Sequence, residues 1–270
     1  MDKSVKIGFI GPGKMAGAII KGLILGTDLP HSQICVYGRN PERNIHFASM
    51  GCTVCSSIEE LNNSSDVIIL SVKPQNFPEI YLKLQPVVAK EKVYVSIAAG
   101  IDFENLKDNL GEDKKFVRAM PNTPLLLGKG ATALCRTDNV TDSEYELIRD
   151  IFKTAGAVAD IDESQMNAVI AVSGSSPAYI YLFAETVCNY ADSIGLDHRK
   201  ALELFAQTLI GSAEMLRSTD YSESQLIDMV CSKGGTTIEA VNTLKSTGFC
   251  ESVTDAMKAC IKRAEELAGK

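Results

Sequence analysis

The sequence lacks any run of basic residues. Its 27 Lys and Arg stand against 34 Asp and Glu, which gives the 270-residue chain a formal net charge of −7. Because proteins that bind nucleic acids present a basic patch or stripe, we expect no nucleic-acid partner. The rest of the composition, with 45% apolar and 23% charged residues, is ordinary for a globular protein. The length predicts one large domain or two of average size.

An uninterrupted apolar segment of membrane-spanning length is also missing. The longest stretch without a charge, residues 164–184, is nominally long enough, but its centre is the polar turn Ser173–Pro177. Such a turn would leave backbone groups without hydrogen bonds in lipid, so we predict two buried helices there. The N-terminal segment lacks the apolar stretch of a signal peptide. We therefore expect a cytoplasmic protein without a membrane partner.

Patterns of metal ligands are absent as well. The three histidines, at positions 31, 46 and 198, form no HExxH motif. Cys52 and Cys55 form a CxxC, but a structural zinc would need a second ligand pair. A thioredoxin-like site would open a helix, whereas this pair lies at the strand-like segment Gly51–Val54. We therefore predict that the eight cysteines are small, reduced core residues and that the protein holds no metal.

Residues 1–161 alternate short apolar runs with segments of helical spacing. The predicted strands are Val5–Ile10, Ile34–Tyr37, Asp66–Val72, Val93–Ala98, Phe116–Arg118, Ala131–Cys135 and Ala157–Ile161. The predicted helices between them are Lys14–Leu25, Pro41–Met50, Phe77–Leu84, Asp102–Asn109 and Asp142–Lys153. Strands without apolar–polar alternation, separated by helices, indicate a parallel sheet that is covered on both faces. We predict an α/β domain of the doubly wound, or Rossmann, type over residues 1–161.

After Asp162 the strand patterns stop and only helical patterns follow. They cover Glu163–Val172, Pro177–Ile194, His198–Leu216, Glu223–Val230, Thr236–Lys245 and Glu251–Leu267, which predicts an all-α domain over residues 162–270. The second of these helices is apolar on most of its circumference. Such a helix must be buried in a large core or against another subunit. Because the helical part is too small to bury it alone, we expect a homodimer or a higher homo-oligomer formed through these helices.

The first predicted strand runs directly into the motif Gly11-Pro12-Gly13-Lys14-Met15-Ala16, a GxGxxA that opens a helix. In dinucleotide-binding enzymes the first glycine of this motif permits a tight turn. The second lets the backbone approach a pyrophosphate, and the small third residue lets the helix pack on the sheet. The pyrophosphate then lies at the positive N-terminus of the helix. We predict a dinucleotide site at this turn.

The end of the second predicted strand indicates which dinucleotide binds. An NAD site usually has an acid here for the ribose hydroxyls, but the run Tyr37–Asn40 is followed by no acid before Glu42. Arg39 has the planar fork that binds a 2′-phosphate, and Asn40 and Arg43 are additional donors. We therefore favour NADP, in its reduced form NADPH, with NAD as the alternative. Arg39 could instead be a solvated loop charge.

Two later strand ends should also meet the cofactor, since ligands of open α/β sheets bind beyond the carboxyl ends of the strands. These are Ser71–Pro74 and Ile97–Gly100, and the small residues of the second would let a nicotinamide lie close to the backbone. Lys73 would act as a catalytic acid or a phosphate contact, or be a loop charge. The full set of predicted cofactor-binding residues is Gly11, Pro12, Gly13, Lys14, Met15, Arg39, Asn40, Ser57, Val72, Lys73, Pro74, Ala98, Ala99 and Gly100.

Several motifs together resemble the pyrroline-5-carboxylate reductase family, whose members catalyse the last step of proline synthesis. Some of them are shared with many dinucleotide enzymes: Ile7–Ile19, Val72–Gln75, Ala98–Gly100 and Met120–Pro124. The helical half adds two more, Ser173–Tyr179 and Ser232-Lys233-Gly234-Gly235-Thr236-Thr237, which together are close to diagnostic. The resemblance covers nearly the whole chain.

The resemblance implies NADPH-dependent reduction of 1-pyrroline-5-carboxylate, a five-membered cyclic imine with a carboxylate, to L-proline. The hydride would pass from the nicotinamide C4 to the imine carbon. Small residues before a helix can turn several backbone N–H groups into an anion site, so we predict that Ser232, Gly234, Gly235 and Thr236 bind the substrate. By analogy with the family, the Thr237 hydroxyl would bond the ring nitrogen. The alternative for this segment is a plain turn between two helices.

Glu163 is the second candidate catalytic residue, because it matches a family carboxylate near the substrate. It could instead be an ordinary acid in the first turn of a helix. Ser176 and Lys233 stand where the family usually has Gly and Pro, so the substrate range could differ. A β-hydroxyacid dehydrogenase would need a lysine within Gln165–Ala184, which has none. The open alternatives are a related imine reductase acting on a different ring and a noncatalytic dinucleotide-binding regulator.

Overall fold

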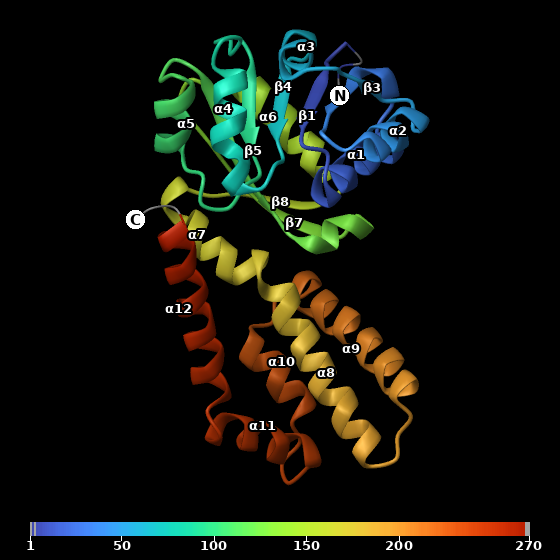
Figure 1. Ribbon diagram of the computed structural model, residues 1–270. Helices are drawn as coiled ribbons and strands as arrows, with labels where there is room; N and C mark the ends of the chain where they lie inside the picture. The colour runs from blue at the N-terminus through green and yellow to red at the C-terminus, as the bar shows by residue number, and fades with distance from the viewer. Residues whose placement is uncertain (1, 3, 268–270) are drawn as a thin grey trace. The chain divides into compact units, whose positions relative to one another are not determined.

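The computed structural model describes residue 2 and residues 4–267 of the chain (Figure 1). In this part of the chain eight strands form one sheet. They are β1 (Ile7–Ile10), β2 (Ile34–Tyr37), β3 (Thr53–Val54), β4 (Val67–Leu70), β5 (Val93–Ser96), β6 (Lys115–Pro121), β7 (Gly130–Arg136) and β8 (Gly156–Asp160). The strands lie in the order β3-β2-β1-β4-β5-β6-β7-β8. The chain therefore leaves β1 first to one side and then, from β4 onward, to the other.

Helices alternate with these strands and then continue alone. Those that accompany the sheet are α1 (Lys14–Gly26), α2 (Pro41–Ser49), α3 (Ile58–Ser64), α4 (Phe77–Leu84), α5 (Phe103–Leu110) and α6 (Asp142–Lys153). Those that follow it are α7 (Met166–Val169), α8 (Ser176–Ser193), α9 (His198–Ser218), α10 (Glu223–Val230), α11 (Thr236–Ser246) and α12 (Phe249–Leu267). The short helix α3 is an addition to the predicted elements, whereas β3 lies in the segment Gly51–Val54 that the sequence identified as strand-like.

The sheet is parallel as predicted, with the exception of one pair of strands. All neighbouring strands are parallel except β6 and β7, which run antiparallel with Ala119 opposite Leu134. The connection between them, residues 122–129, is a short turn of 3₁₀ helix at Thr123–Leu127. A parallel pair needs a crossover of about a dozen or more residues, so this connection only allows the chain to fold back beside β6.

Helices cover both faces of the sheet, as the doubly wound prediction requires (Figure 1). Along β1, Ile7 and Phe9 enter one buried cluster together with residues of α1 and α6, whereas Ile10 enters a second cluster with residues of α3, α4 and α5. Val67 and Ile68 divide between the two clusters in the same way. Successive side chains of a strand point to opposite faces, so strands that are apolar throughout are buried twice. This confirms the Rossmann-type α/β domain.

The chain separates into two compact units. The first runs to Ser175 and also takes in the chain end from Cys260, whereas the second is Ser176–Ala259. The predicted boundary after residue 161 coincides with the end of the last strand, β8, and the first unit continues from there to Ser175. Residues 162–175 stay with the sheet because Met166 and Ala171 are buried at 1% and 0% exposure, and Met166 belongs to a core cluster of the sheet.

The predicted helix Glu163–Val172 is not one regular helix. A 3₁₀ turn at Glu163–Gln165 leads into the single turn α7, and a π-helical turn at Ile170–Gly174 follows. Helix α8 begins only after this turn, at Ser176. Breaks of this kind are frequent at functional sites.

The second unit has a very small core of its own. The long helices α8 and α9 pack against each other, and Phe183 meets Phe205 edge-on at a centroid distance of 5.4 Å (Figure 1). In α8 only Pro177, Cys188 and Ala191 are buried, although the helix is mostly apolar. Among its exposed side chains are Tyr181 and Leu182, at 62% and 63%. Among the described residues no helix is long and apolar enough to cross a membrane.

Candidate active site

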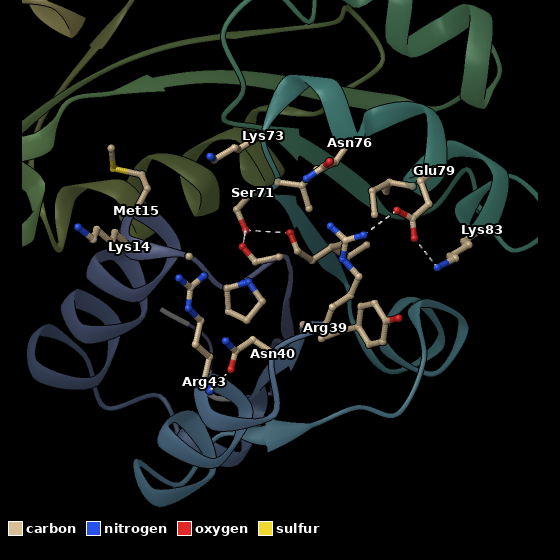
Figure 2. Close-up of a pocket in the computed structure, with 18 of the residues that line it drawn as sticks. Lys14, Met15, Arg39, Asn40, Arg43, Ser71, Lys73, Asn76, Glu79 and Lys83 are labelled. Carbon is tan, nitrogen blue, oxygen red and sulfur yellow. Dashed lines mark hydrogen bonds and ion pairs between the residues drawn. The ribbon is translucent and has the colours of Figure 1, made fainter.

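A cavity of about 780 Å³ lies at the carboxyl ends of β1, β2 and β4, where the order of strands along the chain reverses (Figure 2). This is the place where open α/β sheets bind their ligands. It is lined by Ile10, Gly11, Pro12, Gly13, Lys14, Met15, Tyr37, Gly38, Arg39, Asn40, Pro41, Arg43, Ser71, Val72, Lys73, Asn76, Glu79, Ile80 and Lys83.

The turn after β1 has the backbone geometry that its glycines predict. Gly11 has φ +84°, and a Cβ at this position would collide with Cγ1 of Val72. A Cβ on Gly13 would approach only the carbonyl oxygen of Gly11, at 3.8 Å. Because Gly13 lines the cavity and carries no side chain, it leaves this part of the cavity open to a ligand. Helix α1 begins after Gly13 without a side-chain cap and without an acid in its first turn. Its N-terminal N–H groups are thus suited to an anion such as a pyrophosphate.

The three strand ends are tied together by backbone and side-chain hydrogen bonds. The N–H of Gly11 donates to the carbonyl oxygen of Tyr37 at 2.9 Å, and the N–H of Ser71 donates to that of Ile10 at 2.9 Å. The Ser71 hydroxyl lies 2.9 Å and 3.0 Å from the carbonyl oxygens of Ile10 and Gly11. The cavity floor is therefore held from β1, β2 and β4 at once, which makes it largely pre-formed.

Arg39 is not a free loop charge but one partner in a row of three charged side chains. Its Nη1 donates to Oε2 of Glu79 at 3.0 Å, and Nζ of Lys83 donates to Oε1 of Glu79 at 2.7 Å (Figure 2). Glu79 and Lys83 lie one turn apart on α4 and face the end of β2. All three side chains are exposed, at 65%, 42% and 47%, so the pairs are screened by solvent.

Asn40 and Arg43 lie beside Arg39 at the start of α2. The Asn40 side chain caps the helix by accepting the N–H of Arg43 at 3.1 Å, and Pro41 occupies the first helical position. The Asn40 amide group still borders the cavity with the guanidinium of Arg43 (Figure 2). Cationic and amide donors thus gather at the end of β2.

Most predicted cofactor residues line this cavity, and five lie outside the lining that the structure describes. Those five are Ser57, Pro74, Ala98, Ala99 and Gly100. The Ser57 hydroxyl accepts the N–H of Glu60 at 3.0 Å and so caps α3. Ala98 is buried at 6% exposure. Gly100, with φ +78°, borders a second cavity instead.

The second cavity, of about 270 Å³, contains Glu163. It is lined by Gly100, Asp102, Glu104, Arg118, Glu163, Ser164 and Asn167. Oε1 of Glu163 accepts the N–H of Phe103 at 2.7 Å and Nη1 of Arg118 at 2.9 Å. The Arg118 side chain is only 6% exposed, whereas that of Glu163 is 36% exposed. Glu163 therefore joins β6 to the first turn of α5 at the border of this cavity.

The predicted substrate segment lies in the second unit, between α10 and α11. Gly234 has φ +72° with open space around its Cα, and the N–H of Gly235 donates to the carbonyl oxygen of Ser232 at 3.0 Å. A Cβ on Gly235 would lie 2.4 Å from the Ser232 hydroxyl oxygen, so a side chain at this position would require that hydroxyl to move. Helix α11 then begins at Thr236 without a side-chain cap. Thr237, in its first turn, is half-buried.

Five of the eight cysteines are buried, whereas Cys231 and Cys260 are half-buried and Cys250 is exposed, so the prediction that all eight are core residues is wrong for these three. All eight are free thiols, and Cys52 and Cys55 are buried at 7% and 3% exposure. Burial raises the pKa of Cys52 to about 11 and that of Cys55 to about 12. Because a thiol must ionise to react, this CxxC is unsuited to redox chemistry. Among the described residues no group of three or more His, Cys, Asp or Glu side chains could hold a metal ion.

Comparisons with known proteins agree with both halves of this arrangement. A family model described as "Pyrroline-5-carboxylate reductase dimerisation" matches residues 163–267, and one described as "NADP oxidoreductase coenzyme F420-dependent" matches residues 6–100. The pyrroline-5-carboxylate reductase of Pisum sativum is 38% identical over 268 residues, covering 99% of this chain and 98% of that protein. That of Escherichia coli K12 is 38% identical over 264 residues, 97% of this chain and 98% of the relative. The chain belongs to the pyrroline-5-carboxylate reductase family.

A solved structure shows that the likeness extends to the whole fold. The Plasmodium falciparum pyrroline carboxylate reductase, solved with NADP bound, superposes with a TM-score of 0.90 at 29% identity, and it covers 99% of this chain and 100% of its own. The resemblance inferred from the sequence motifs is thus confirmed.

Sequence reasoning missed five charged residues that line the two cavities, namely Glu79, Lys83, Asp102, Glu104 and Arg118. Arg118 could have been identified from the sequence, because a charged residue inside the apolar strand Lys115–Pro121 needs a partner of opposite charge when it is buried. For Glu79 and Lys83 the sequence offers only their i,i+4 spacing on a helix, which is common and does not indicate a site. Only the position of α4 beside the end of β2 brings them to the cavity.

Proposed function

We propose that this protein reduces 1-pyrroline-5-carboxylate to L-proline with NADPH. The observation that carries the proposal is the pre-formed cavity at the β1, β2 and β4 ends, with Arg39, Asn40 and Arg43 at its rim, in a member of this family. NADPH supplies the hydride for the imine carbon. The chain itself has to bind and orient the reactants, because a protonated imine is already electrophilic.

The large cavity is the proposed cofactor site. The N–H groups at the start of α1 would hold the pyrophosphate, and the absence of side chains at Gly11 and Gly13 leaves room for it. Arg39, Asn40 and Arg43 would hold the 2′-phosphate that distinguishes NADP from NAD. The predicted contacts of Ser57, Pro74 and Ala98–Gly100 remain part of the proposal, with Gly100 at the second cavity.

The segment Ser232–Thr237 is the proposed substrate site. Its support is a glycine in the left-handed region at Gly234, a close approach of Gly235 to the Ser232 hydroxyl, and the uncapped start of α11. Backbone N–H groups there would bind the substrate carboxylate. The Thr237 hydroxyl would bond the ring nitrogen and fix the face that receives the hydride.

Glu163 would act near the imine through the carboxylate oxygen that is not engaged by Arg118 and Phe103. Its support is the cavity that it borders and the rigid hold on its other oxygen. A negative charge held in this way would stabilise the protonated imine.

We also propose that residues 162–270 hold the substrate and form a homodimer or a larger homo-oligomer. The support is the apolar surface of α8 and α9, in which Ile180, Leu182, Leu204 and Ile210 are 45–65% exposed in the single chain. Surfaces of this kind are typical of interfaces between subunits. Light scattering should give at least twice the 29.1 kDa chain mass, and a monomer at micromolar concentration would refute this part. A cytoplasmic location remains a prediction.

The activity is tested by NADPH oxidation with a panel of cyclic imines. The panel contains five- and six-membered rings, each with and without the carboxylate. We expect the five-membered carboxylate to be reduced with the highest kcat/KM and its decarboxylated analogue to lose most of this rate. Preference for another ring would indicate a related imine reductase. NADPH binding without turnover of any imine would indicate a noncatalytic regulator.

A further inference from the structure

Glu79 places a negative charge where the proposed function needs a positive one. It lies in the first turn of α4, and its carboxylate engages the guanidinium of Arg39 at 3.0 Å and the ammonium of Lys83 at 2.7 Å (Figure 2). The described residues that line the cavity include the cations Lys14, Arg39, Arg43, Lys73 and Lys83, but one acid, Glu79. The proposed reaction gives this acid no role.

The Glu79 carboxylate is ionised at neutral pH. The hydrogen bond from Lys83 lowers the pKa of Glu79, and the positive charges of Lys83 and Arg39 lower it further. Oε2 of Glu79 accepts a hydrogen bond from Nη1 of Arg39, and Oε1 accepts one from Nζ of Lys83 on the same helix. The hydrogen bond from Lys83, on the same helix, therefore holds the Glu79 carboxylate in position beside Arg39.

We propose that Glu79 is a specificity-determining residue that weakens the preference of the cofactor site for NADPH over NADH. This inference rests on the proposed assignment of the large cavity to the cofactor. A 2′-phosphate must compete with Glu79 for the guanidinium of Arg39, and it is repelled by the carboxylate. A cofactor with a 2′-hydroxyl meets neither obstacle, because the Arg39–Glu79 pair can persist and a hydroxyl can donate to a carboxylate.

The expected effect is moderate because the charges are exposed. Ion pairs in such surroundings are screened by water and salt, so a change of about two- to fivefold in affinity is the scale to look for. Glu79→Gln removes the charge and keeps the shape of the side chain. It should strengthen the binding of NADPH by this factor and leave that of NADH within about twofold.

Direct binding isolates this effect from catalysis. The dissociation constants of NADPH, NADH, 2′,5′-ADP and 5′-AMP would be measured by calorimetry or fluorescence at low and high salt, for the wild type and Glu79→Gln. The gain should appear for NADPH and 2′,5′-ADP, which carry the 2′-phosphate, and shrink at high salt. The two ligands without this phosphate should respond little.

Glu146→Gln is the matched control. Glu146 also bridges two cations, Arg149 at 3.2 Å and Lys153 at 3.7 Å, but on α6 and away from the cavity lining. It should leave all four dissociation constants unchanged. An unaltered ratio of NADPH to NADH affinity in Glu79→Gln, or weaker NADPH binding, would overturn the role of Glu79. If wild-type protein binds 2′,5′-ADP no tighter than 5′-AMP, and Arg39→Gln changes neither, the cavity assignment itself fails and both proposals fall.

Discussion

Oε1 of Glu163 accepts hydrogen bonds from the guanidinium of Arg118 and from the backbone N–H of Phe103. Arg118 lies in the middle of β6 and is 5% exposed, whereas Glu163 lies on the turn that follows β8. A carboxylate held by two donors on different elements has little freedom to move. The pair therefore links the packing of strand β6, inside the sheet, to the position of a proposed catalytic group.

Arg118→Met should destabilise the protein by about 2 kcal/mol. The substitution removes the donor to Glu163 and leaves a partly buried carboxylate with one partner fewer. Urea unfolding would measure the change. Arg263→Met is the control, because Arg263 pairs with Glu266 at 67% exposure and should contribute less than about 0.5 kcal/mol. If both substitutions lowered the free energy of unfolding by the same amount, burial would not strengthen the Arg118–Glu163 pair.

A double-mutant cycle between Arg118 and Glu163 should reveal strong coupling in kcat/KM. We expect Glu163→Gln and Arg118→Met each to lower kcat/KM, and the double variant to lower it no further than the stronger single change. Residues that act as a unit are non-additive in this way. Glu104→Gln, on the same cavity, is the control and should combine additively with Arg118→Met. Additivity in the main cycle would mean that Arg118 does not position Glu163.

Thr237→Ala should lower kcat/KM by about tenfold to a hundredfold, which equals about 1.4–2.8 kcal/mol of lost transition-state contact. NADPH affinity should remain unchanged, and Thr237→Ser should keep most of the activity because it retains the hydroxyl. Thr243→Ala is the matched control, since Thr243 lies on the same helix and donates to the carbonyl oxygen of Glu239. A loss beyond about a thousandfold would identify an essential proton donor instead. Wild-type rates in Thr237→Ala would place the active site elsewhere.

Arg39→Gln should weaken NADPH binding by about tenfold and leave NADH binding nearly unchanged. The guanidinium is the proposed partner of the 2′-phosphate, and a charge-assisted hydrogen bond of an exposed group accounts for a change of this size. Fluorescence titration with both cofactors would measure it. Arg217→Gln, an exposed arginine of the second unit, serves as the control. Equal losses for the two cofactors would remove Arg39 from the 2′-phosphate site.

The contribution of Glu144 to stability should disappear in acid. Partial burial raises the pKa of Glu144, but hydrogen bonds from Lys115 and Thr141 outweigh this, and the net pKa lies below the ordinary 4.5. A carboxyl whose folded pKa is lowered stabilises the protein above its unfolded pKa and loses this effect as the pH falls through the folded value. The stability difference between wild type and Glu144→Gln should therefore be constant near neutral pH and shrink below pH 4.5. Thermal unfolding between neutral pH and pH 3 would measure it, and a constant difference would contradict the assignment.

The sequence by itself determined the local structure and the general location of the cofactor site. Strands such as Val67–Leu70 are recognisable because apolar residues fill every position, which only a sheet buried on both faces requires. The turn Gly11–Gly13 is recognisable because few residues other than glycine permit its backbone. Periodicity and backbone sterics act over a few residues, so a linear pattern contains them. Family motifs then led from this turn to the reaction.

Only the tertiary structure decided which distant side chains meet. The antiparallel pairing of β7 with β6, the hydrogen bond of Arg118 to Glu163 and that of Arg39 to Glu79 join residues that lie 11 to 45 positions apart. The order of strands and the packing of helices against them determine such contacts, and many charged residues of similar type compete for each partner. A charge pattern does not specify its partner. The acid that the end of β2 lacks in the sequence is thus supplied by α4, whose Glu79 accepts a hydrogen bond from Arg39 in the folded protein.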